Sequence, residues 1–242
     1  IDVVRVNDAP VLASAEGSAL SFTEGGSATA ITSALTVADS DDTNIESATV
    51  QITGNLDNSE DVLAFTNQNG ITGTFTSSTG LMTLSGSATL ANYQTALRSV
   101  TYQNTDTDNP STSQRTVTFT VNDGDVNSNT QTRTIDVVRV NDAPVLASAE
   151  TSALSFTEGG SATAITSALT VSDVDDTNIE SATVQITGNL DNSEDVLAFT
   201  NQNGITGTFT SSTGLLTLTG SATLANYRSE EHTSELQLPD HL

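Results

Sequence analysis

The chain contains a long internal sequence repeat, and the period of this repeat indicates the size of its folding unit. The stretch IDVVRVNDAPVLASAE begins at Ile1 and again at Ile135, a spacing of 134 residues. Residues 1–93 and 135–227 differ at five positions: Gly17/Thr151, Ala38/Ser172, Ser40/Val174, Met82/Leu216 and Ser85/Thr219. This period is too long for a solenoid unit and matches one compact domain. The sequence therefore predicts successive domains with the same fold.

The charge of the chain limits the partners that it can bind. Its 242 residues include 30 acidic and six basic side chains, so the net charge is −24 at pH 7. Such a charge repels nucleic acid and anionic membranes and attracts divalent cations. Alternatively, the acidity only keeps a secreted protein soluble. No apolar run approaches the roughly 20 residues of a membrane-spanning helix, and the absence of cysteine excludes disulfides and thiolate metal sites.

Alternating apolar and polar residues predict short β-strands along each repeat. In TVTFTVND, Val117, Phe119 and Val121 share one face and threonines share the other. Residues 19–24, 47–53 and 133–140 show the same alternation, and Asn69-Gly70 has the composition of a hairpin turn. A repeat with about seven to nine such strands is typical of an antiparallel β-sandwich. The predicted fold class is therefore all-β.

One segment of the repeat has a helical pattern instead. In SATLANYQTALRSV, Leu90, Tyr93 and Leu97 recur at helical spacing, and Thr89 stands where a helix N-cap belongs. We expect a short crossover helix here.

The repeats lack the residues that most hydrolytic enzymes need. Residues 1–227 contain no histidine, cysteine or lysine, which excludes Ser-His-Asp, Cys-His and lysine-based mechanisms. Paired carboxylates would suffice for a glycosidase. However, sugar-cleaving sites usually stack the sugar ring on aromatic side chains. The chain has no tryptophan and only three tyrosines, so few such rings are present. We expect that the protein is not an enzyme.

Acidic residues gather in the loop that follows one predicted strand. VADSDDTNIE carries Asp39, Asp41, Asp42, Asn44 and Glu46, and the second copy keeps all five types. Like charges this close repel one another unless water or a cation screens them. Calcium takes six to eight oxygen ligands, which this loop supplies, although its spacing is not that of an EF-hand. The alternative is a solvated acidic turn, and DNSED at 57–61 and TDTDNP at 105–110 are weaker cases of the same kind.

Four motifs in order resemble the cadherin repeat. IDVVRVNDAPVL is similar to the cadherin inter-domain linker, LSFTEGG to the early strand with its calcium-binding glutamate, TVADSDD to the Asp-x-Asp motif, and TFTVNDGD to the late strand. The resemblance covers the first repeat and is closer to the cadherin-like tandem repeats of large bacterial surface proteins and RTX-type adhesins. It implies tandem Ig/cadherin-like antiparallel sandwiches, each with a short crossover helix, the second copy being truncated.

The resemblance also implies Ca²⁺ at the junctions between repeats. The ligands of the complete junction would be Glu24, Asn141, Asp142, Asp173, Asp175 and Asp176. Those of an earlier junction would be Asn7, Asp8, Asp39, Asp41, Asp42 and Asp123. The chain departs from the cadherin pattern in three ways. Arg5 and Arg139 stand where the cadherin linker has its first aspartate, and one linker asparagine is missing before Ala-Pro. A helical segment replaces the cadherin Asp-Arg-Glu motif. These departures imply fewer ions at each junction than in a cadherin.

The function implied is a calcium-rigidified structural spacer of a large secreted or cell-surface bacterial adhesin. Its partners would be the neighbouring repeats of the same chain, with host or biofilm ligands bound by other domains, and it would bind no nucleic acid and enter no membrane. Two alternatives remain open: a glycan- or protein-binding adhesive module, and a non-catalytic region of a large secreted enzyme.

The expected division is residues 1–8 as the end of a preceding repeat, 9–142 as a complete repeat, 143–227 as a truncated repeat and 228–242 as a foreign tail. RSEEHTSELQ, residues 228–237, resembles the in-frame translation of a sequencing-library adapter. Its His232, and His241 beyond it, are therefore not offered as ligands. The truncated repeat lacks counterparts of residues 94–141, so we expect its open strand edges to prevent stable folding.

Overall fold

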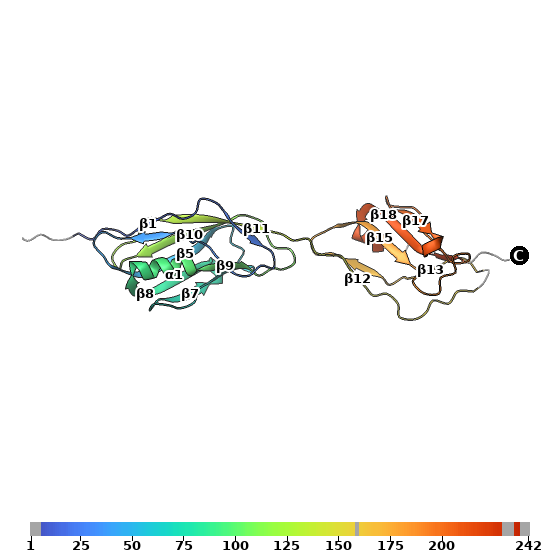
Figure 1. The fold of residues 1–242 in the computed structure, drawn as a ribbon, viewed down its shortest axis with the longest axis horizontal. Helices are drawn as coiled ribbons and strands as arrows, with labels where there is room; N and C mark the ends of the chain where they lie inside the picture. The colour runs from blue at the N-terminus through green and yellow to red at the C-terminus, as the bar shows by residue number, and fades with distance from the viewer. Residues whose placement is uncertain (1–5, 158–159, 229–234, 238–242) are drawn as a thin grey trace, which may run out of the picture. The chain divides into compact units, whose positions relative to one another are not determined.

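The chain divides into two compact units, residues 1–140 and 141–242, and each is described by itself (Figure 1). The computed structural model describes residues 6–157, 160–228 and 235–237. Strands dominate both units, which confirms the all-β prediction. Within the described residues, no helix has the length and apolar character needed to cross a membrane.

The first unit is a sandwich of short strands with one helix. Its elements are β1 (Val11–Ala13), β2 (Leu20–Thr23), β3 (Thr29–Ala30), β4 (Thr36–Ala38), β5 (Asn44–Gly54), β6 (Asp61–Ala64), β7 (Thr72–Thr76), the 3₁₀ turn η1 (Ser77–Thr79), β8 (Leu81–Thr89), α1 (Leu90–Ser99), β9 (Thr101–Asn104), β10 (Arg115–Asn122) and β11 (Gln131–Val138).

A six-stranded sheet in the order β2-β11-β10-β5-β8-β7 forms one layer of this unit. The pairings from β11 to β7 are antiparallel, whereas β2 runs parallel to β11, with Leu20 opposite Ile135 and Phe22 opposite Val137. A second sheet has the order β3-β9-β6, and β1 pairs with β4. The parallel pair therefore joins a strand near the start of the unit to its last strand.

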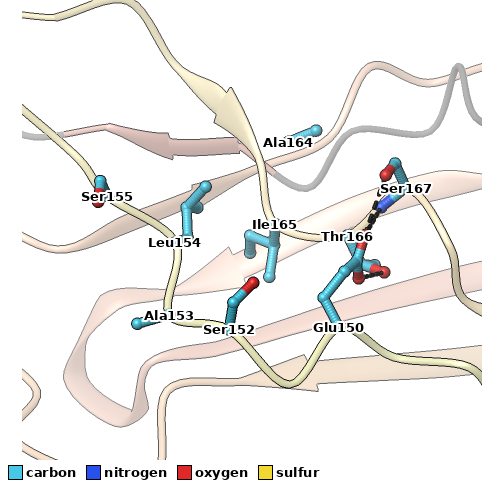
Figure 2. A pocket seen from close by; sticks show the side chains of 9 residues that line it. All are labelled: Glu150, Ser152, Ala153, Leu154, Ser155, Ala164, Ile165, Thr166 and Ser167. Carbon is cyan, nitrogen blue, oxygen red and sulfur yellow. Dashed lines mark hydrogen bonds between the residues drawn. The ribbon is translucent and has the colours of Figure 1, made fainter.

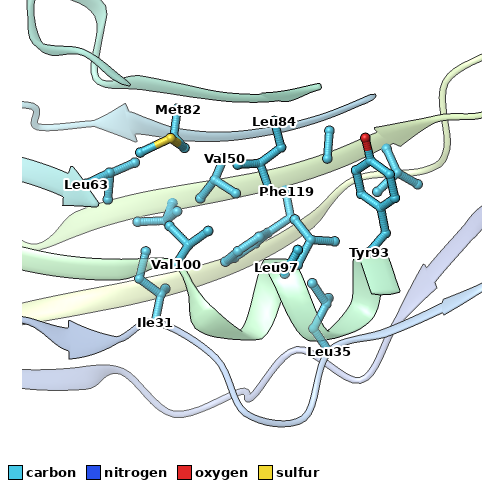
Figure 3. Packing of buried hydrophobic residues seen from close by; sticks show 14 of the residues in the cluster. Ile31, Leu35, Val50, Leu63, Met82, Leu84, Tyr93, Leu97, Val100 and Phe119 are labelled. Carbon is cyan, nitrogen blue, oxygen red and sulfur yellow. The ribbon is translucent and has the colours of Figure 1, made fainter. Parts of the chain in front are cut away.

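The core lies between the two sheets and the helix. Val50 and Phe119 from the large sheet, Leu63 from the small sheet and Leu97 from α1 point into it, as Figure 3 shows. All four side chains are at most 1% exposed. Burying a side chain of this size stabilises the folded state by about 1.5–3 kcal/mol. The apolar residues that alternate along the predicted strands therefore face the core, and the polar residues between them face the solvent.

The helix begins where the sequence predicted. Thr89 has an extended backbone, and its hydroxyl accepts a hydrogen bond from the Asn92 amide at 3.2 Å, which is the geometry of an N-cap. Tyr93 and Leu97 are buried on one face of α1, and the Tyr93 hydroxyl donates to the Gly86 carbonyl at 2.7 Å. The helix therefore covers the core and also ties β8 to it.

One residue of the acidic segment 57–61, for which a solvated loop was an alternative, is buried. Asp61 is 1% exposed and accepts hydrogen bonds from the Tyr102 hydroxyl at 2.6 Å and from Nε of Arg115 at 3.0 Å. Arg115 is itself fully buried and donates to the carbonyls of Ser111 and Ser113. The alternative of a solvated loop over 57–61 was wrong for Asp61, because this arginine comes from a strand 54 residues away.

The second unit repeats part of this arrangement. Its elements are β12 (Val145–Ala147), β13 (Thr163–Ala164), β14 (Thr170–Ser172), β15 (Asn178–Gln185), β16 (Val196–Ala198), β17 (Thr206–Thr210), η2 (Ser211–Thr213), β18 (Leu215–Thr223), α2 (Leu224–Arg228) and β19 (Glu235–Gln237).

The sheets of this unit are smaller, with orders β15-β18-β17, β13-β19-β16 and β12-β14. Its buried cluster consists of Leu197, Ile205, Leu216, Leu218 and Ala222. The strand β19 was not predicted, and it pairs with β13 and β16 as β9 pairs with β3 and β6. The expected domain division, the adapter origin of the tail and the instability of this unit stay predictions.

Candidate metal site

Three aspartates from two distant segments meet at one end of the first unit. Asp39 and Asp42 belong to the loop between β4 and β5, and Asp123 follows the end of β10. One carboxylate oxygen of each lies within 4.8 Å of the other two. Because antiparallel β5 and β10 pair along their length, the start of β5 and the end of β10 lie at the same edge of the sheet. This group can hold a metal ion.

The loop is folded by its own first aspartate. Oδ1 of Asp39 accepts the backbone N–H groups of Asp41 at 3.0 Å and Asp42 at 2.9 Å, which makes a tight Asx turn. The other oxygen, Oδ2, is buried and has no hydrogen-bond partner in the described part of the chain. The turn therefore presents an unsatisfied carboxylate oxygen to the cluster.

Asp123 is the most buried member of the group, at 7% exposed. Burial raises its pKa, but the N–H groups of Val126 and Asp125 and the side chain of Asn7 outweigh this effect, so the pKa lies below its ordinary value of 3.8. The two backbone donors lie 2.8 Å from Oδ1. Asp123 is thus held as a carboxylate at neutral pH.

A glutamate that the resemblance did not assign also faces this cluster. Glu46 stands on β5, where the pairing with β8 shifts register between Ile45 and Ser47. Its Oε1 accepts from the Ser87 hydroxyl at 3.0 Å, and its Oε2 is buried without a partner among the described residues. Burial, followed by the charges of Asp41, Asp39, Asp123 and Glu46, raises the pKa of Asp42 above 3.8. Glu46 therefore belongs to the same electrostatic group.

The segment before β1 is hydrogen-bonded to the cluster. Asn7 donates from Nδ2 to Asp123 at 3.0 Å, and the Asp8 amide donates to Asp41 at 3.2 Å. The Ser40 hydroxyl donates to Asp8 at 2.9 Å. Of the six residues predicted for the earlier junction, the structure therefore brings three into one ligand-sized group and places Asn7, Asp8 and Asp41 beside it.

The second unit has a related group of Asp173, Asp175 and Asp176, again within 4.8 Å, whose members are the counterparts of Asp39, Asp41 and Asp42 and come from a single loop. Oδ1 of Asp173 accepts from the amides of Asp176 and Asp175, and the Asp176 bond is the first cause that lowers the pKa of Asp173. The Asp142 amide donates to Asp175 at 3.3 Å, and both Asp142 and Asp175 keep one buried oxygen without a partner in the described residues. Asn141 donates to the carbonyl of Asp142 at 2.6 Å.

Glu24, the remaining predicted ligand, lies in the first unit. It is 8% exposed, its Oε2 accepts from the Val140 amide at 2.8 Å, and its Oε1 is buried with no partner that the described residues supply. The joint site implied by the resemblance, with Glu24 and the aspartates of the second unit, stays a prediction.

The electrostatics of these groups favour a cation. Carboxylates this close repel one another, and a buried oxygen without a partner costs about 1–3 kcal/mol. A divalent ion bound between them would remove both costs. The residues present therefore fit a metal ion, although carboxylates alone do not select calcium over other hard cations.

A hollow in the second unit is a different kind of feature. Glu150 stands at its rim, and its carboxylate accepts from Thr166 Oγ1 at 2.5 Å and from the Ser167 amide at 2.7 Å (Figure 2). These bonds lower the pKa of Glu150 to about 2. The carboxylate is occupied by the segment that follows β13 and is not offered as a ligand-binding group.

The comparisons with known proteins give a partial match. No family model matches the chain. A segment of 73 residues is 48% identical to Halomucin of Haloquadratum walsbyi, covering 28% of this chain and 1% of that protein. The chain therefore spans about one hundredth of the length of Halomucin.

A solved structure, the AgI/II polypeptide BspA C-terminal domain of Streptococcus agalactiae, aligns over 79% of this chain and 73% of its own. The sequence identity is 9% and the TM-score is 0.22, so this alignment carries no argument.

Proposed function

We propose that the chain is a structural spacer in a large secreted or cell-surface protein, and that its acidic groups bind calcium, which stiffens the repeats. The match to Halomucin supports a very long parent protein. Two near-identical units in succession support a spacer, since a spacer needs length and not a unique surface. The resemblance to cadherin-like bacterial repeats supports the same reading.

The observation that carries the calcium proposal is the pair of buried, unsatisfied oxygens in the first unit. Asp39 Oδ2 and Glu46 Oε2 have no partner among the described residues. Asp39 lies in the ligand-sized group with Asp42 and Asp123, and the charge of Glu46 acts on Asp42 of that group. A loop that only stays in water would turn such oxygens outward, because water would then satisfy them. Their burial fits a site shaped around an ion.

Calcium is the ion that this donor set fits best. All the side-chain donors are oxygens, the carboxylates come from separate segments, and Ca²⁺ accepts six to eight oxygens in flexible geometry. Mg²⁺ requires a near-ideal octahedron and gives up its water reluctantly. The carboxylates of Asp39, Asp42, Asp123 and Glu46, completed by water, would form the site.

The proposed stiffening acts through the segment that enters the unit. Asn7 is hydrogen-bonded to Asp123 of the ligand-sized group, and Asp8 to Asp41 beside that group. Without an ion, the repulsion among the carboxylates works against this arrangement. A divalent ion would offset part of this negative charge and hold the entering segment in place.

Calorimetric titration of the full chain with CaCl₂ after EDTA treatment tests the binding. We expect Asp39→Asn combined with Asp123→Asn to weaken binding to the first unit at least tenfold, and Glu46→Gln to weaken it less. Asp108→Asn is the matched control, because Asp108 is an exposed loop aspartate outside the group. Equal heats for the double variant and this control would refute the site.

The stiffening is tested separately on a chain that carries two complete repeats. Small-angle scattering should give a larger maximum dimension in CaCl₂ than in EDTA, with a smaller change in MgCl₂. Calcium binding with unchanged scattering would keep the site and refute the spacer role.

The adhesive alternative has less support from the side chains. Tyr93 and Tyr102 are fully buried, as are Phe22 and Phe119, so these rings offer no surface on which a sugar could stack. A glycan array probed with the full chain remains the direct test of that alternative.

A further inference from the structure

A two-residue turn leads into β7 in the first unit. Gln68 and Ile71 face each other across it, and each backbone amide donates to the other's carbonyl, at 3.1 and 2.7 Å. Between them, Asn69 and Gly70 have φ angles of +52° and +80°, both in the left-handed region. Asn-Gly suits such a turn, because asparagine tolerates this conformation and glycine has no Cβ to oppose it. The fold therefore favours these two residue types here.

The same pair of residues is chemically labile. Asparagine is thermolabile in proteins because the backbone nitrogen of the next residue can attack its side-chain carbonyl carbon. Glycine obstructs this approach least, and nothing lies within 4 Å of where a Cβ on Gly70 would stand. Asn69 and Gly70 are both exposed, and within the described residues no hydrogen bond holds the Gly70 N–H. This nitrogen is therefore free to react.

Other asparagines that precede a small residue lack this freedom. In Asn58-Ser59 the serine amide donates to the Asp57 carboxylate at 3.1 Å. In Asn127-Ser128 the serine amide donates to the Val121 carbonyl at 2.9 Å. A nitrogen held in this way must break its hydrogen bond before it can attack. The turn before β7 thus combines the labile pair with an open backbone nitrogen.

We propose that Asn69-Gly70 is a site of spontaneous deamidation. The Gly70 nitrogen forms a bond to Cγ of Asn69, the bond from Cγ to the side-chain nitrogen breaks, and ammonia leaves with the proton of the backbone N–H. Water then opens the resulting succinimide ring. Attack at Cγ gives aspartate, whereas attack at the main-chain carbonyl gives isoaspartate, in which the main chain continues through Cγ. Asn203-Gly204, with φ angles of +50° and +80°, is the same site in the second unit.

The isoaspartate product does not fit the turn. It adds one carbon to the main chain between Gln68 and Ile71, whose mutual hydrogen bonds set the length of the turn. Ile71 is 1% exposed in the core, and the Gly70 carbonyl oxygen lies against β8 at Gly86. The Gln68 side chain also donates to the hydroxyl of Ser99 in α1 at 2.7 Å. Deamidation therefore loosens the contacts of β7 with β8 and α1.

Mass spectrometry of the full chain, kept in mildly alkaline buffer, tests the reaction. Cleavage after arginine gives peptides 6–98 and 140–228, which each contain one turn and differ in mass. We expect the replacement of NH₂ by OH at Asn69 and Asn203 to accumulate roughly tenfold faster than at Asn58 or Asn127, where a hydrogen bond must first break. Asn69→Gly is the control, because it keeps a turn-compatible residue but has no amide to lose.

Two outcomes would overturn the deamidation site. In the first, Asn69 keeps its amide in the folded chain while a linear peptide of residues 66–73 loses it, since the turn would then protect the asparagine. In the second, Asn58 converts as fast as Asn69, since the open nitrogen would then have no influence.

Thermal unfolding by circular dichroism tests the loosening of β7, in a chain with Asn203→Gly so that only the turn of the first unit reacts. Asn69→Asp adds the new charge on an unchanged main chain, and we expect it to melt with the unreacted chain. The aged chain, with its isoaspartate detected by isoaspartyl methyltransferase, should melt at a lower temperature. Equal melting of the aged chain and Asn69→Asp would refute the loosening.

Discussion

At the scale of single residues, Asp61 and Arg115 form a fully buried ion pair in the first unit. Both side chains are fully buried. The guanidinium also donates to the carbonyls of Ser111 and Ser113 and lies 3.5 Å from the Glu60 carboxylate. Removing one partner of such a pair leaves an uncompensated buried charge. The pair therefore ties the start of β10 to the start of β6.

We expect Asp61→Asn to destabilise the first unit by about 3–5 kcal/mol, because Arg115 keeps its charge in a buried position. Urea unfolding followed by tyrosine fluorescence measures this, since Tyr93 and Tyr102 both lie in the first unit. Asp195→Asn is the matched control and should cost much less, because Asp195 is half-buried. Equal effects of the two substitutions would contradict this account.

Glu16 makes stability depend on pH. Burial raises its pKa, but hydrogen bonds from Thr32 and Ser33 outweigh this and lower it from 4.5 to about 2. The carboxylate accepts from Thr32 Oγ1 and the Ser33 amide, both at 2.7 Å. A lowered folded-state pKa contributes stability above the unfolded pKa, and that contribution disappears as the pH falls.

We therefore expect the stabilisation by Glu16 to be complete above about pH 4.5 and to be lost between there and about pH 2. Its size is on the order of 1 kcal/mol, because the carboxylate is partly exposed. Urea midpoints at pH 7 and pH 3 should differ less in Glu16→Gln than in the unchanged chain. An unaltered difference would show that Glu16 does not contribute.

The structural role of a residue could be predicted from the sequence where it depends on residues nearby in the chain. The Asx-rich loop and the Thr89 cap were predicted because their partners lie within a few residues. The burial of Asp61 could not be predicted, since Arg115 is distant in the chain. Glu46 was noted as acidic but was not assigned as a ligand. The direction in which its side chain points depends on a register shift between β5 and β8.

At the scale of elements, β8 passes very close to the turn that precedes β7. Gly86 has a φ of +131°, and a Cβ there would lie 2.3 Å from the Gly70 carbonyl oxygen. The obstacle is backbone and cannot rotate away. Only glycine fits this position.

We expect Gly86→Ala to destabilise the first unit by about 3 kcal/mol, through backbone strain and overpacking. Gly17→Thr is the control, because Gly17 has nothing within 4 Å of a Cβ and the second repeat already has Thr151 there. It should change stability by less than about 0.5 kcal/mol. Thermal unfolding by circular dichroism compares the two, and similar midpoints would contradict the steric argument.

The strands themselves were predictable, but their order was not. Alternation located the segments of β5, β10 and β11, and Asn69-Gly70 located a turn, because these are local signals. The order β2-β11-β10-β5-β8-β7 depends on pairings between distant segments, including one parallel pair. No periodicity within a strand encodes its neighbour, which is also why the β19 pairing was missed.

At the scale of the whole molecule, calcium should couple binding to folding. An ion that binds only the folded form adds RT ln(1 + [L]/Kd), about 2.7 kcal/mol at a hundredfold excess over Kd. We expect CaCl₂ to raise the melting temperature of the full chain relative to EDTA, and MgCl₂ to raise it less. Differential scanning calorimetry with the Asp39→Asn and Asp123→Asn variant shows whether the first unit is responsible.

The parallel pairing of β2 with β11 determines how a repeat responds when its ends are pulled. The chain enters before β2 and leaves after β11, so tension draws these two strands along their axes in opposite directions. Their hydrogen bonds are then loaded together in shear and do not open one after another. A repeat built this way should act as a mechanical clamp that holds until the whole β2–β11 ladder gives way at once.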